Sequence, residues 1–567
     1  MIRSCLLSDQ LSWVIALRSV SVIMAMSLVL VFSPLRLMAA TTPSLPQPTL
    51  VVVIVVDQLR ADLLQRQYQH GFARLMGEGR VYEKAQLGHA VSTTCPGHAV
   101  VLTGFHPSKI GIPSNSFIDE QSGELLYCVF DDDPGTLEIG GDEQRSPRIM
   151  RVSTLGDWMK TSDPNSKVFS LSGKDRAAIT LGGQHADAAY WFNRKTGRFI
   201  SSGYYMTELP DYVAKFNGSD PVADGYMKDF PERWQHGPGS QREDDFPGED
   251  DELGISSGHP VTLGETRSIA AQVFQSPYID EATLGLALEV FREEQLGRGD
   301  SIDLLAISLS AADTIGHLYG PNSAEAEDNL NRLDTLLGTL LDELDQALGK
   351  QGYIVAFTAD HGVADLPEWK KRQGNLQCSK NDGRIELLPL AFQLYWKIYW
   401  EFTFPFGDPR PMVSFSGAGL SISRDSVRQH NQTFENVRAY IESLLEANDF
   451  VANAWTKTEI EHNAGPEAEL MRHSYVAGRS ADLIVQFHEG CMLPGAGTTH
   501  GSLYHYDRHI PLVFYGWKVK PALLQQPAMS VDIGPTLANH IGIEVPQVLD
   551  GSVLLLAEPV GPEADSR

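Results

Sequence analysis

Six side chains of metal-ligand type are spread over the chain, and they are Asp57, Asp313, His317, Asp360, His361 and His500. In the segment "DTIGH" an aspartate and a histidine stand four residues apart, so one helical turn would place both on the same face. Three carboxylates and three imidazoles form a mixed oxygen and nitrogen set that suits zinc, with manganese or iron as lesser options. Six ligands are too many for one tetrahedral zinc, so we expect two ions with three protein ligands each. Paired ions can stabilise both the entering and the leaving oxygen of a phosphoryl transfer.

A second segment that could do chemistry reads "STTCPGH" and spans residues 92–98. It offers hydroxyl groups at Thr93 and Thr94, a thiol at Cys95 and an imidazole at His98. A Cys–His nucleophile pair is one interpretation of this segment. The other is a hydroxyl group that a bound metal ion activates by lowering its pKa.

The segment "SGKDRAAI" carries Lys174 and Arg176, two residues apart. On a strand or in an extended loop these two side chains point the same way. An ammonium group acts as a point charge and a guanidinium group as a fork that contacts two oxygens, so the pair suits a phosphate ester. Ordinary ion pairs at the surface are the alternative interpretation.

Continuous apolar runs precede most of the candidate ligands. The strand candidates are the runs at 50–57, 167–172, 303–313, 353–362, 481–487 and 510–516. Such runs are typical of strands buried on both faces, as in parallel sheets. A leucine stripe predicts a helix over 323–348, with Asn322 and Glu325 as a capping box and Gly349 as its end.

Strands that alternate with helices predict an α/β fold in which a doubly wound, mostly parallel sheet is sandwiched by helices. Sheets of this kind bind ligands beyond the carboxyl ends of their strands. Asp57, Asp313 and Asp360 all stand at or just after such ends, which favours a functional role over solvated turns.

Two segments are predicted to be insertions, one at 218–262 and the other at 376–480. The first contains the acidic stretch "REDDFPGEDDE" at 242–252, which we interpret as a solvated loop. Calcium binding is the alternative there, although no EF-hand spacing is visible. The second contains an aromatic stretch at 392–406, interpreted as packing of a cap or hairpin, with substrate stacking or membrane contact as alternatives.

The N-terminus has the layout of a secretory signal, because basic residues precede an apolar run at 20–32 and small residues follow it. The run is short for a membrane span, and an uncleaved anchor is the alternative. We therefore expect a signal peptide over 1–40 and a single catalytic domain over 41–567. This predicts a periplasmic or secreted protein, with no stable membrane partner unless the signal stays uncleaved.

Composition excludes one class of partner. The chain has 45 Lys and Arg against 72 Asp and Glu, a formal charge of −27, which argues against nucleic acid as a partner. An apolar content of 42% is ample for a core. Of five cysteines, Cys5 would leave with the signal, and the other four show no C-x-x-C spacing. One or two disulfides can form in an oxidising compartment, and the sequence leaves their pairing open.

In combination these motifs resemble the alkaline phosphatase superfamily, and within it the PafA-type, phosphate-irrepressible alkaline phosphatases. The resemblance runs over roughly 48–555. It is carried by "VVVIVVDQLR", "STTCPGHAVVLTGFHPSKIGIPSNSF", "SLSGKDRAAI", "AAYWFNRKTGRF", "SAADTIGHLYGPNS", "FTADHGV" and "THGSLYHYDRHIPLVFYG". Nucleotide pyrophosphatase/phosphodiesterases are related members that lack the Lys-x-Arg pair.

The resemblance implies roles for individual residues. One zinc would be held by Asp313, His317 and His500, and the other by Asp57, Asp360 and His361, with Thr94 bound to the second zinc as the nucleophile. Asn115, Lys174 and Arg176 would contact the phosphoryl oxygens. Cys95 is interpreted as a small buried thiol, His98 as a residue that orients the nucleophile loop, and His89, His505 and His509 as structural.

The predicted function is that of an exported two-zinc alkaline phosphatase, which hydrolyses small phosphate monoesters through a covalent phosphothreonine. A phosphodiesterase, a nucleotide pyrophosphatase or a phosphonate hydrolase on the same scaffold is the alternative enzyme. A catalytically inactive, exported binding protein is the alternative outside enzymes. A sulfatase is not expected, because its C-x-P-x-R motif, aligned on the proline, would need cysteine at Thr94 and arginine at His98.

Overall fold

The computed structural model describes residues 47–237, 242–378, 380–404, 407, 412–417, 419–493, 495–545 and 548–557. Contacts divide the chain into Met1–Gln47 and Pro48–Arg567. The predicted signal peptide at 1–40 lies outside the described residues. Within the described ranges, no helix is long and apolar enough to cross a membrane.

A nine-stranded sheet forms the centre of the larger unit. Its strands, in spatial order, are β17 (Ala522–Met529), β2 (Arg80–Gln86), β16 (Leu512–Gly516), β11 (Tyr353–Thr358), β1 (Leu50–Val56), β10 (Asp303–Leu309), β5 (Val168–Ser172), β6 (Ala188–Asn193) and β7 (Arg198–Ile200). Five of the eight strand pairings are parallel, so the prediction of a mostly parallel sheet is confirmed. Strand β16, one of the runs expected in a parallel arrangement, pairs antiparallel with both of its neighbours.

The central strands are buried on both faces. All seven residues of β1 are buried, as the unbroken run of valine, isoleucine and leucine predicts. Strand β1 pairs in parallel with β10 and β11, with Val56 opposite Leu309 and Val55 opposite Thr358. The carboxyl ends of these three strands therefore meet at one edge of the sheet.

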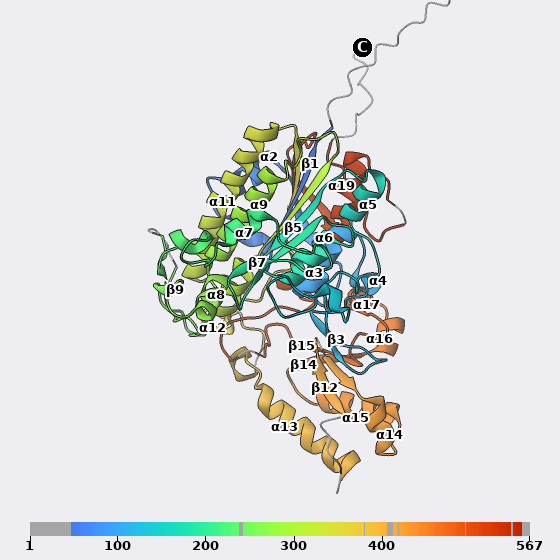
Figure 1. The fold of residues 1–567 in the computed structure, drawn as a ribbon. Helices are drawn as coiled ribbons and strands as arrows, with labels where there is room; N and C mark the ends of the chain where they lie inside the picture. Colours follow the sequence, from blue (N-terminus) through green and yellow to red (C-terminus); the bar gives the residue numbers. More distant parts are fainter. Residues whose placement is uncertain are drawn as a thin grey trace, which may run out of the picture. The chain divides into compact units, whose positions relative to one another are not determined.

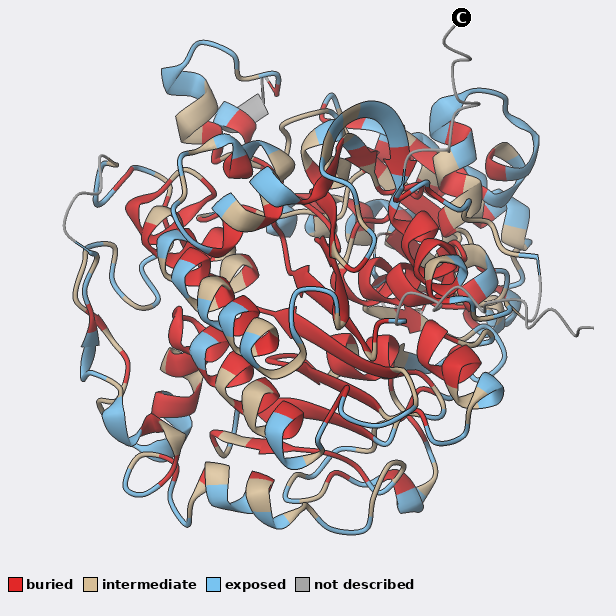
Figure 2. Cartoon of the chain, turned by 90° about the horizontal axis from the view of Figure 1, so that it is seen from above, coloured by how far each residue is buried: buried red, intermediate tan, exposed pale blue. Residues whose placement is uncertain are grey.

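Helices cover both faces of this sheet (Figure 1). One layer contains α2 (Gly71–Glu78), α9 (Tyr278–Glu293), α10 (Ala311–Tyr319) and α11 (Ala324–Leu348), and the other contains α3 (Thr94–Thr103), α5 (Leu155–Ser162), α6 (Asp175–Gly182) and α19 (Ile533–Ile541). Figure 2 shows the buried strands between helices whose outward faces are exposed. The prediction of a sheet sandwiched by helices is confirmed.

Helix α11 begins differently from the prediction. Its N-cap is Ser323, whose hydroxyl accepts a hydrogen bond from the Ala326 N–H at 3.1 Å. Asn322 and Glu325 do not form a capping box, because the Glu325 carboxylate turns to the side chain of His259 instead. Gly349 ends the helix with a φ of +74°, as predicted.

A second, four-stranded sheet takes three of its strands from the predicted insertion at 376–480, and the fourth, at Leu483–Phe487, follows that insertion. Its order is β12 (Val413–Ser416), β13 (Gly419–Ile422), β15 (Leu483–Phe487) and β14 (Val451–Thr456), and all its pairings are antiparallel. The run at 481–487 was expected with the buried parallel strands, and that expectation is wrong. An apolar run specifies burial but not which sheet the strand joins.

Helices complete this smaller module. They are α13 (Leu387–Ile398), α14 (Arg424–Gln429), α15 (Phe434–Glu446), α16 (Lys457–His462) and α17 (Pro466–Ser474). Leu390, Leu394 and Ile398 of α13 are buried in the module's core, whereas Phe392 and Trp396 are exposed. The predicted packing of the aromatic stretch is therefore wrong for these two residues.

The remaining elements are short. The helices are α4 (Pro107–Ile110), α7 (Asp211–Asn217), α8 (Thr266–Phe274), α12 (Pro367–Arg372) and α18 (His505–Arg508). Two small hairpins pair β3 (Ser116–Ile118) with β4 (Leu125–Tyr127) and β8 (Arg233–Trp234) with β9 (His259–Pro260).

Candidate active site

The candidate ligands gather at the carboxyl edge of the large sheet. Asp57 follows β1, Asp360 and His361 follow β11, and Asp313 lies in the first turn of α10, directly after β10. Parallel strands end at the same edge, so residues that are hundreds of positions apart in sequence become neighbours.

One group consists of Asp313, His317 and His500. The Asp313 Oδ1 atom lies 3.3 Å from His317 Nε2 and 3.5 Å from His500 Nε2. Asp313 and His317 share a face of α10, as their four-residue spacing predicts. His500 comes from the loop before α18.

The other group consists of Asp57, Asp360 and His361, and all three are fully buried. The His361 Nε2 atom lies 3.5 Å from Asp57 Oδ1 and 3.3 Å from Asp360 Oδ2. The rings of His361 and His500 stack with centroids 3.6 Å apart, which places the two groups side by side. The structure thus brings together all six side chains that the sequence singled out.

Backbone carbonyl groups orient the three imidazoles. The Nδ1 atoms of His317, His500 and His361 lie 2.8, 2.7 and 2.9 Å from the carbonyl oxygens of Thr498, Ser92 and Gly362, respectively. A carbonyl oxygen only accepts, so each Nδ1 carries the proton and each Nε2 presents a lone pair to the group. This is the arrangement that metal-binding histidines use.

Several polar atoms of the second group are buried without a hydrogen-bond partner among the described residues. They are Asp57 Oδ1, His361 Nε2 and Asp360 Oδ2, the last of which has an ion-pair contact with His98 Nδ1 at 3.0 Å. Burial, and then the negative charges of Asp313 and Asp360, raise the pKa of Asp57 to about 7. Lone pairs and negative charges that converge in a buried space fit two divalent cations.

Lys174 connects the two groups. Its Nζ atom donates to Asp57 Oδ2 at 2.6 Å and also to Asp313 Oδ2. The residue lies in the turn between β5 and α6, so it enters the site from a fourth parallel strand. Arg176 follows two residues later, in the first turn of α6.

Thr94 is the first residue of α3, and it lies beside Arg176. The Arg176 Nη2 atom donates to Thr94 Oγ1 at 3.3 Å. His98, one turn further along α3, has Nδ1 3.0 Å from Asp360 Oδ2 and Nε2 2.8 Å from Ser308 Oγ. Helix α3 therefore presents a hydroxyl group, and its imidazole holds a carboxylate of the second group.

Cys95 is cross-linked to Cys128, so its interpretation as a buried free thiol is wrong. A second disulfide joins Cys378 to Cys491, in line with the expectation of one or two. The Asn115 side chain accepts from the Cys95 N–H at 2.8 Å, and its carbonyl oxygen accepts from the Cys128 N–H at 3.0 Å. Asn115 is thus fixed beside the start of α3.

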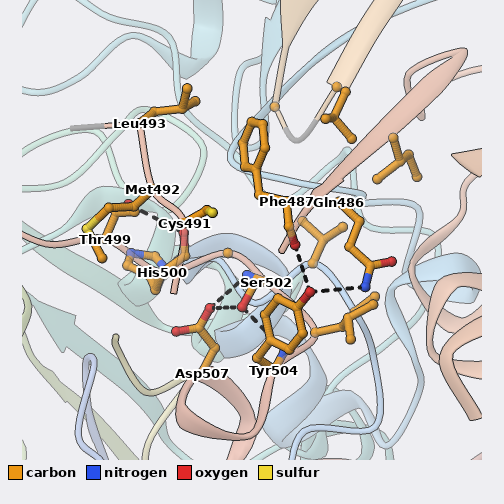
Figure 3. A pocket seen from close by; sticks show the side chains of 18 of the residues that line it. Gln486, Phe487, Cys491, Met492, Leu493, Thr499, His500, Ser502, Tyr504 and Asp507 are labelled. Carbon is orange, nitrogen blue, oxygen red and sulfur yellow. Dashed lines mark hydrogen bonds between the residues drawn. The ribbon is translucent and has the colours of Figure 1, made fainter. Parts of the chain in front are cut away.

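Two cavities of opposite character adjoin the site. A polar cavity of about 560 Å³ is lined by Lys174, Arg176, Asp313 and His317, among others. A largely apolar cavity of about 370 Å³ lies on the His500 side. Figure 3 shows His500 on one side of it and Gln486, Phe487 and Tyr504 on the other, with the Tyr504 hydroxyl donating to the Phe487 carbonyl oxygen at 2.7 Å. Lys174, Arg176 and Asp313 line the polar cavity, and none of these three side chains lines the apolar one.

Comparisons with known proteins agree with this geometry. The sequence profile of the family described as Type I phosphodiesterase / nucleotide pyrophosphatase matches residues 51–505. The chain is 30% identical over 534 residues to "Alkaline phosphatase PafA" of Elizabethkingia meningoseptica, covering 90% of this chain and 94% of the relative. The chain belongs to the alkaline phosphatase superfamily.

A solved structure supports this membership, and a further curated relative is similar over most of its length. A solved structure of the alkaline phosphatase PafA superposes with a TM-score of 0.80 at 28% identity, covering 90% of this chain and 99% of the other. A protein named "Calcium-transporting ATPase" from Myroides odoratus is 33% identical over 531 residues, covering 88% of this chain and 93% of its own. The resemblance to PafA-type members of the superfamily is confirmed.

The sequence analysis did not single out Gln58, which donates hydrogen bonds to both groups of candidate metal ligands. Gln58 follows Asp57 directly and has a φ of +70°, in the left-handed region that few residues other than glycine adopt. Its backbone N–H donates to Asp360 Oδ1 at 3.1 Å and its side-chain Nε2 to Asp313 Oδ1 at 3.0 Å. Its position directly after a ligand at a strand end was the available signal.

Proposed function

We propose that this chain is an exported two-zinc alkaline phosphatase that hydrolyses phosphate monoesters through a phosphothreonine. The observation that carries the proposal is the position of the Thr94 hydroxyl. It stands 3.3 Å from the Arg176 guanidinium group, on the helix whose His98 holds a carboxylate of the second metal group. A hydroxyl group, a cationic fork and two cation sites are the parts that in-line phosphoryl transfer requires.

The two groups of ligands would hold zinc. When bound there, zinc lowers the pKa of a coordinated hydroxyl group and offsets the negative charge of the transferring phosphoryl group. The mixed set of carboxylates and imidazoles supports zinc over calcium or magnesium, which prefer oxygen ligands.

Thr94 would give up its hydroxyl proton to solvent and attack phosphorus, which forms a bond from Oγ1 to phosphorus and breaks the bond to the ester oxygen. That oxygen would take up a proton from solvent and leave as the alcohol. Water would then attack the phosphothreonine, releasing inorganic phosphate and restoring the hydroxyl group. Arg176 and Asn115 are placed to donate to the non-bridging oxygens, where charge is redistributed in the transition state. Lys174 neutralises Asp57 and Asp313 and lies within reach of the same oxygens.

Preference for monoesters follows from charge. A monoester dianion carries more charge on its non-bridging oxygens than a diester, so a Lys–Arg pair favours the monoester. The matching family profile names phosphodiesterases, and a diesterase or a phosphonate hydrolase is the rival function.

Export is part of the same proposal. We infer a signal peptide over 1–40 and a mature domain over 41–567. The two disulfides support an oxidising compartment, since cytosolic thiols generally stay reduced.

The test compares rates on one aryl phosphate monoester and its matched methyl diester, using zinc-loaded full-length chain. We expect the turnover rate on the monoester to exceed that on the diester by at least about 10²-fold, because one positioned charged donor changes the rate by about that factor. Enzyme quenched in acid during turnover should carry phosphate on Thr94 by peptide mass spectrometry. A faster diester would favour the rival enzyme, and phosphate on another residue would exclude Thr94.

A further inference from the structure

A third cluster of potential metal ligands lies outside the active site. His236 follows β8, His259 is the first residue of β9, and Glu325 lies in the first turn of α11. The ligand atoms of these three side chains all lie within 4.8 Å of one another. We call this set the hairpin cluster, and it falls partly in the insertion at 218–262.

The spacing of the hairpin cluster is that of a coordination shell. Glu325 Oε1 lies 3.2 Å from His236 Nε2 and 3.1 Å from His259 Nε2. Ligands about 2.0–2.1 Å from a tetrahedral zinc are separated from one another by about 3.3 Å. The corresponding separations in the two groups of the active site are slightly longer, between 3.3 and 3.5 Å.

The protonation pattern also matches. His259 Nδ1 lies 3.3 Å from the carbonyl oxygen of Leu253, and the neutral tautomer that donates to this oxygen has its lone pair at Nε2. That lone pair faces a carboxylate oxygen, and two acceptors at this distance repel unless a cation lies between them. The imidazoles of the active site are oriented by backbone carbonyls in the same way.

A shared proton does not satisfy the hairpin cluster. A proton on His259 Nε2 would satisfy that nitrogen and Glu325 Oε1. In the part of the chain that the structure describes, two further buried atoms make no hydrogen bond. They are Glu325 Oε2 and His236 Nε2, and the latter has an ion-pair contact at 3.2 Å with the same oxygen, Glu325 Oε1, that His259 already faces. Glu325 is 0% exposed and His259 is 1% exposed, so solvent does not offer easy compensation.

We propose that His236, His259 and Glu325 bind a third divalent transition-metal ion, zinc by the chemistry of its ligands, as a structural site. Two imidazoles and a carboxylate suit zinc, whereas calcium prefers sites made of oxygen ligands alone. The ion fastens the β8–β9 hairpin to the start of α11.

The surroundings of the hairpin cluster assign it a structural role. Trp234 Nε1 and the Gly237 N–H both donate to the Asp328 carboxylate on α11 at 2.7 Å, so the hairpin is already docked on this helix. The hydroxyl of Tyr319, the last residue of α10, lies 3.3 Å from His259 Nδ1. An ion here would brace the end of the helix that carries Asp313 and His317.

The test is a metal count by elemental analysis on the full chain, dialysed against a weak chelator and reloaded with zinc. We expect three zinc ions per chain in the wild type and two in His236→Gln and in Glu325→Gln. His185→Gln is the matched control, because His185 also contacts a carboxylate, Asp157, at 3.0 Å. Its side chain is 65% exposed, and among the described residues it belongs to no group of three potential metal ligands. It should keep three ions.

Reloading with cobalt gives an independent readout, since each tetrahedral cobalt absorbs visible light. His236→Gln should lose about a third of that absorbance, and its melting temperature should respond less to added metal. Turnover at saturating zinc should stay within about twofold of the wild type. Two ions in the wild type, or an unchanged count in both cluster variants, would overturn the proposal. The count does not depend on catalysis, so it stands apart from any failure of the phosphatase assignment.

Discussion

The active site and the hairpin cluster use the same ligand chemistry in different surroundings. In both, imidazole Nε2 atoms converge on a carboxylate at 3.1–3.5 Å, and buried lone pairs lack hydrogen-bond partners among the described residues. The active site, however, lies where four parallel strands end, next to Thr94, Arg176 and a polar cavity of about 560 Å³. The neighbours of the hairpin cluster are Trp234 and Tyr319, which pack around it.

This comparison distinguishes the features of a structural metal site from those of a catalytic one. Ligand spacing alone would assign both regions the same role. What distinguishes them is a hydroxyl group and a cationic fork within reach of the ligands, together with space for a substrate. Variants that change one region should therefore leave the other intact.

The largest effect is expected for Thr94→Ala. Loss of the proposed nucleophile should lower kcat on a monoester by at least about 10³, while the metal content of both regions stays unchanged. Steady-state rates and elemental analysis on the same preparation check this.

Thr93→Ala is the control for that variant. Thr93 is the N-cap of α3, but its hydroxyl caps nothing, so its loss should change kcat less than tenfold. An active Thr94→Ala, or an inactive Thr93→Ala, would show that the hydroxyl beside Arg176 is not the nucleophile.

Arg176→Ala comes next in size. Removal of a positioned cationic donor should lower monoester turnover by about 10²–10³ and diester turnover far less. Arg194→Ala is a matched control, since Arg194 lines the same cavity but stacks on the ring of Phe274 at 4.2 Å. Equal losses on both substrates would mean that charge recognition does not set specificity.

Gln58→Ala should weaken zinc binding at the active site by about 10–100-fold and leave the hairpin cluster loaded, because Gln58 orients Asp313 and Asp360 only. Zinc titration with a competing chelator measures this. Gln58→Gly relaxes the backbone at φ +70° yet also removes the side chain, so it should lose as much affinity. Wild-type affinity in Gln58→Gly would assign the effect to backbone strain.

The smallest effect on activity is expected for Asp280→Asn, which tests whether one unpartnered oxygen is enough for a metal site. Asp280 Oδ1 accepts from the N–H groups of Ser310 and Ala311, and Oδ2 has no partner among the described residues. Burial raises the pKa of Asp280 to about 7. We expect turnover within about twofold and an unchanged metal count.

The pKa of Asp280 also predicts how the stability difference between Asp280→Asn and the wild type changes with pH. A carboxyl group whose folded pKa is raised binds more protons in the folded state, so its contribution to stability falls as pH rises from about 4 to about 7. The variant should therefore gain melting temperature relative to the wild type over that range and keep the gain above it. Scanning calorimetry at several pH values checks this, and parallel curves would exclude a titrating Asp280.

Much of the large sheet could be predicted because its signals are local. Unbroken valine and isoleucine runs specify strands buried on both faces, and an aspartate after each run falls at the shared edge. The run at 481–487 carries the same signal but joins the other sheet, since only its partners β13 and β14 determine that.

Other features depend on contacts between distant residues. His259 and Glu325 are brought together by the docking of a hairpin on α11, and no spacing in the sequence marks them. Glu325 even sits where a capping residue would, which favoured a wrong interpretation. The pairing of Cys95 with Cys128 and the positive φ of Gln58 likewise emerge only from tertiary structure.

The Cys95–Cys128 cross-link has a consequence for when the chain becomes active. It joins two residues with a sequence separation of 33, and the loop that it closes includes Asn115 and begins directly after Thr94. The Asn115 side chain accepts from the Cys95 N–H, so the cross-link helps to fix the residue that the proposed function assigns to the phosphoryl oxygens. A newly made chain in a reducing cytosol has the same residues but lacks this closure. We therefore expect turnover to rise as the disulfide forms, and a comparison of the rates of reduced and oxidised chain checks this. Together with the proposed export, such a dependence would spare the phosphate esters of the cytosol.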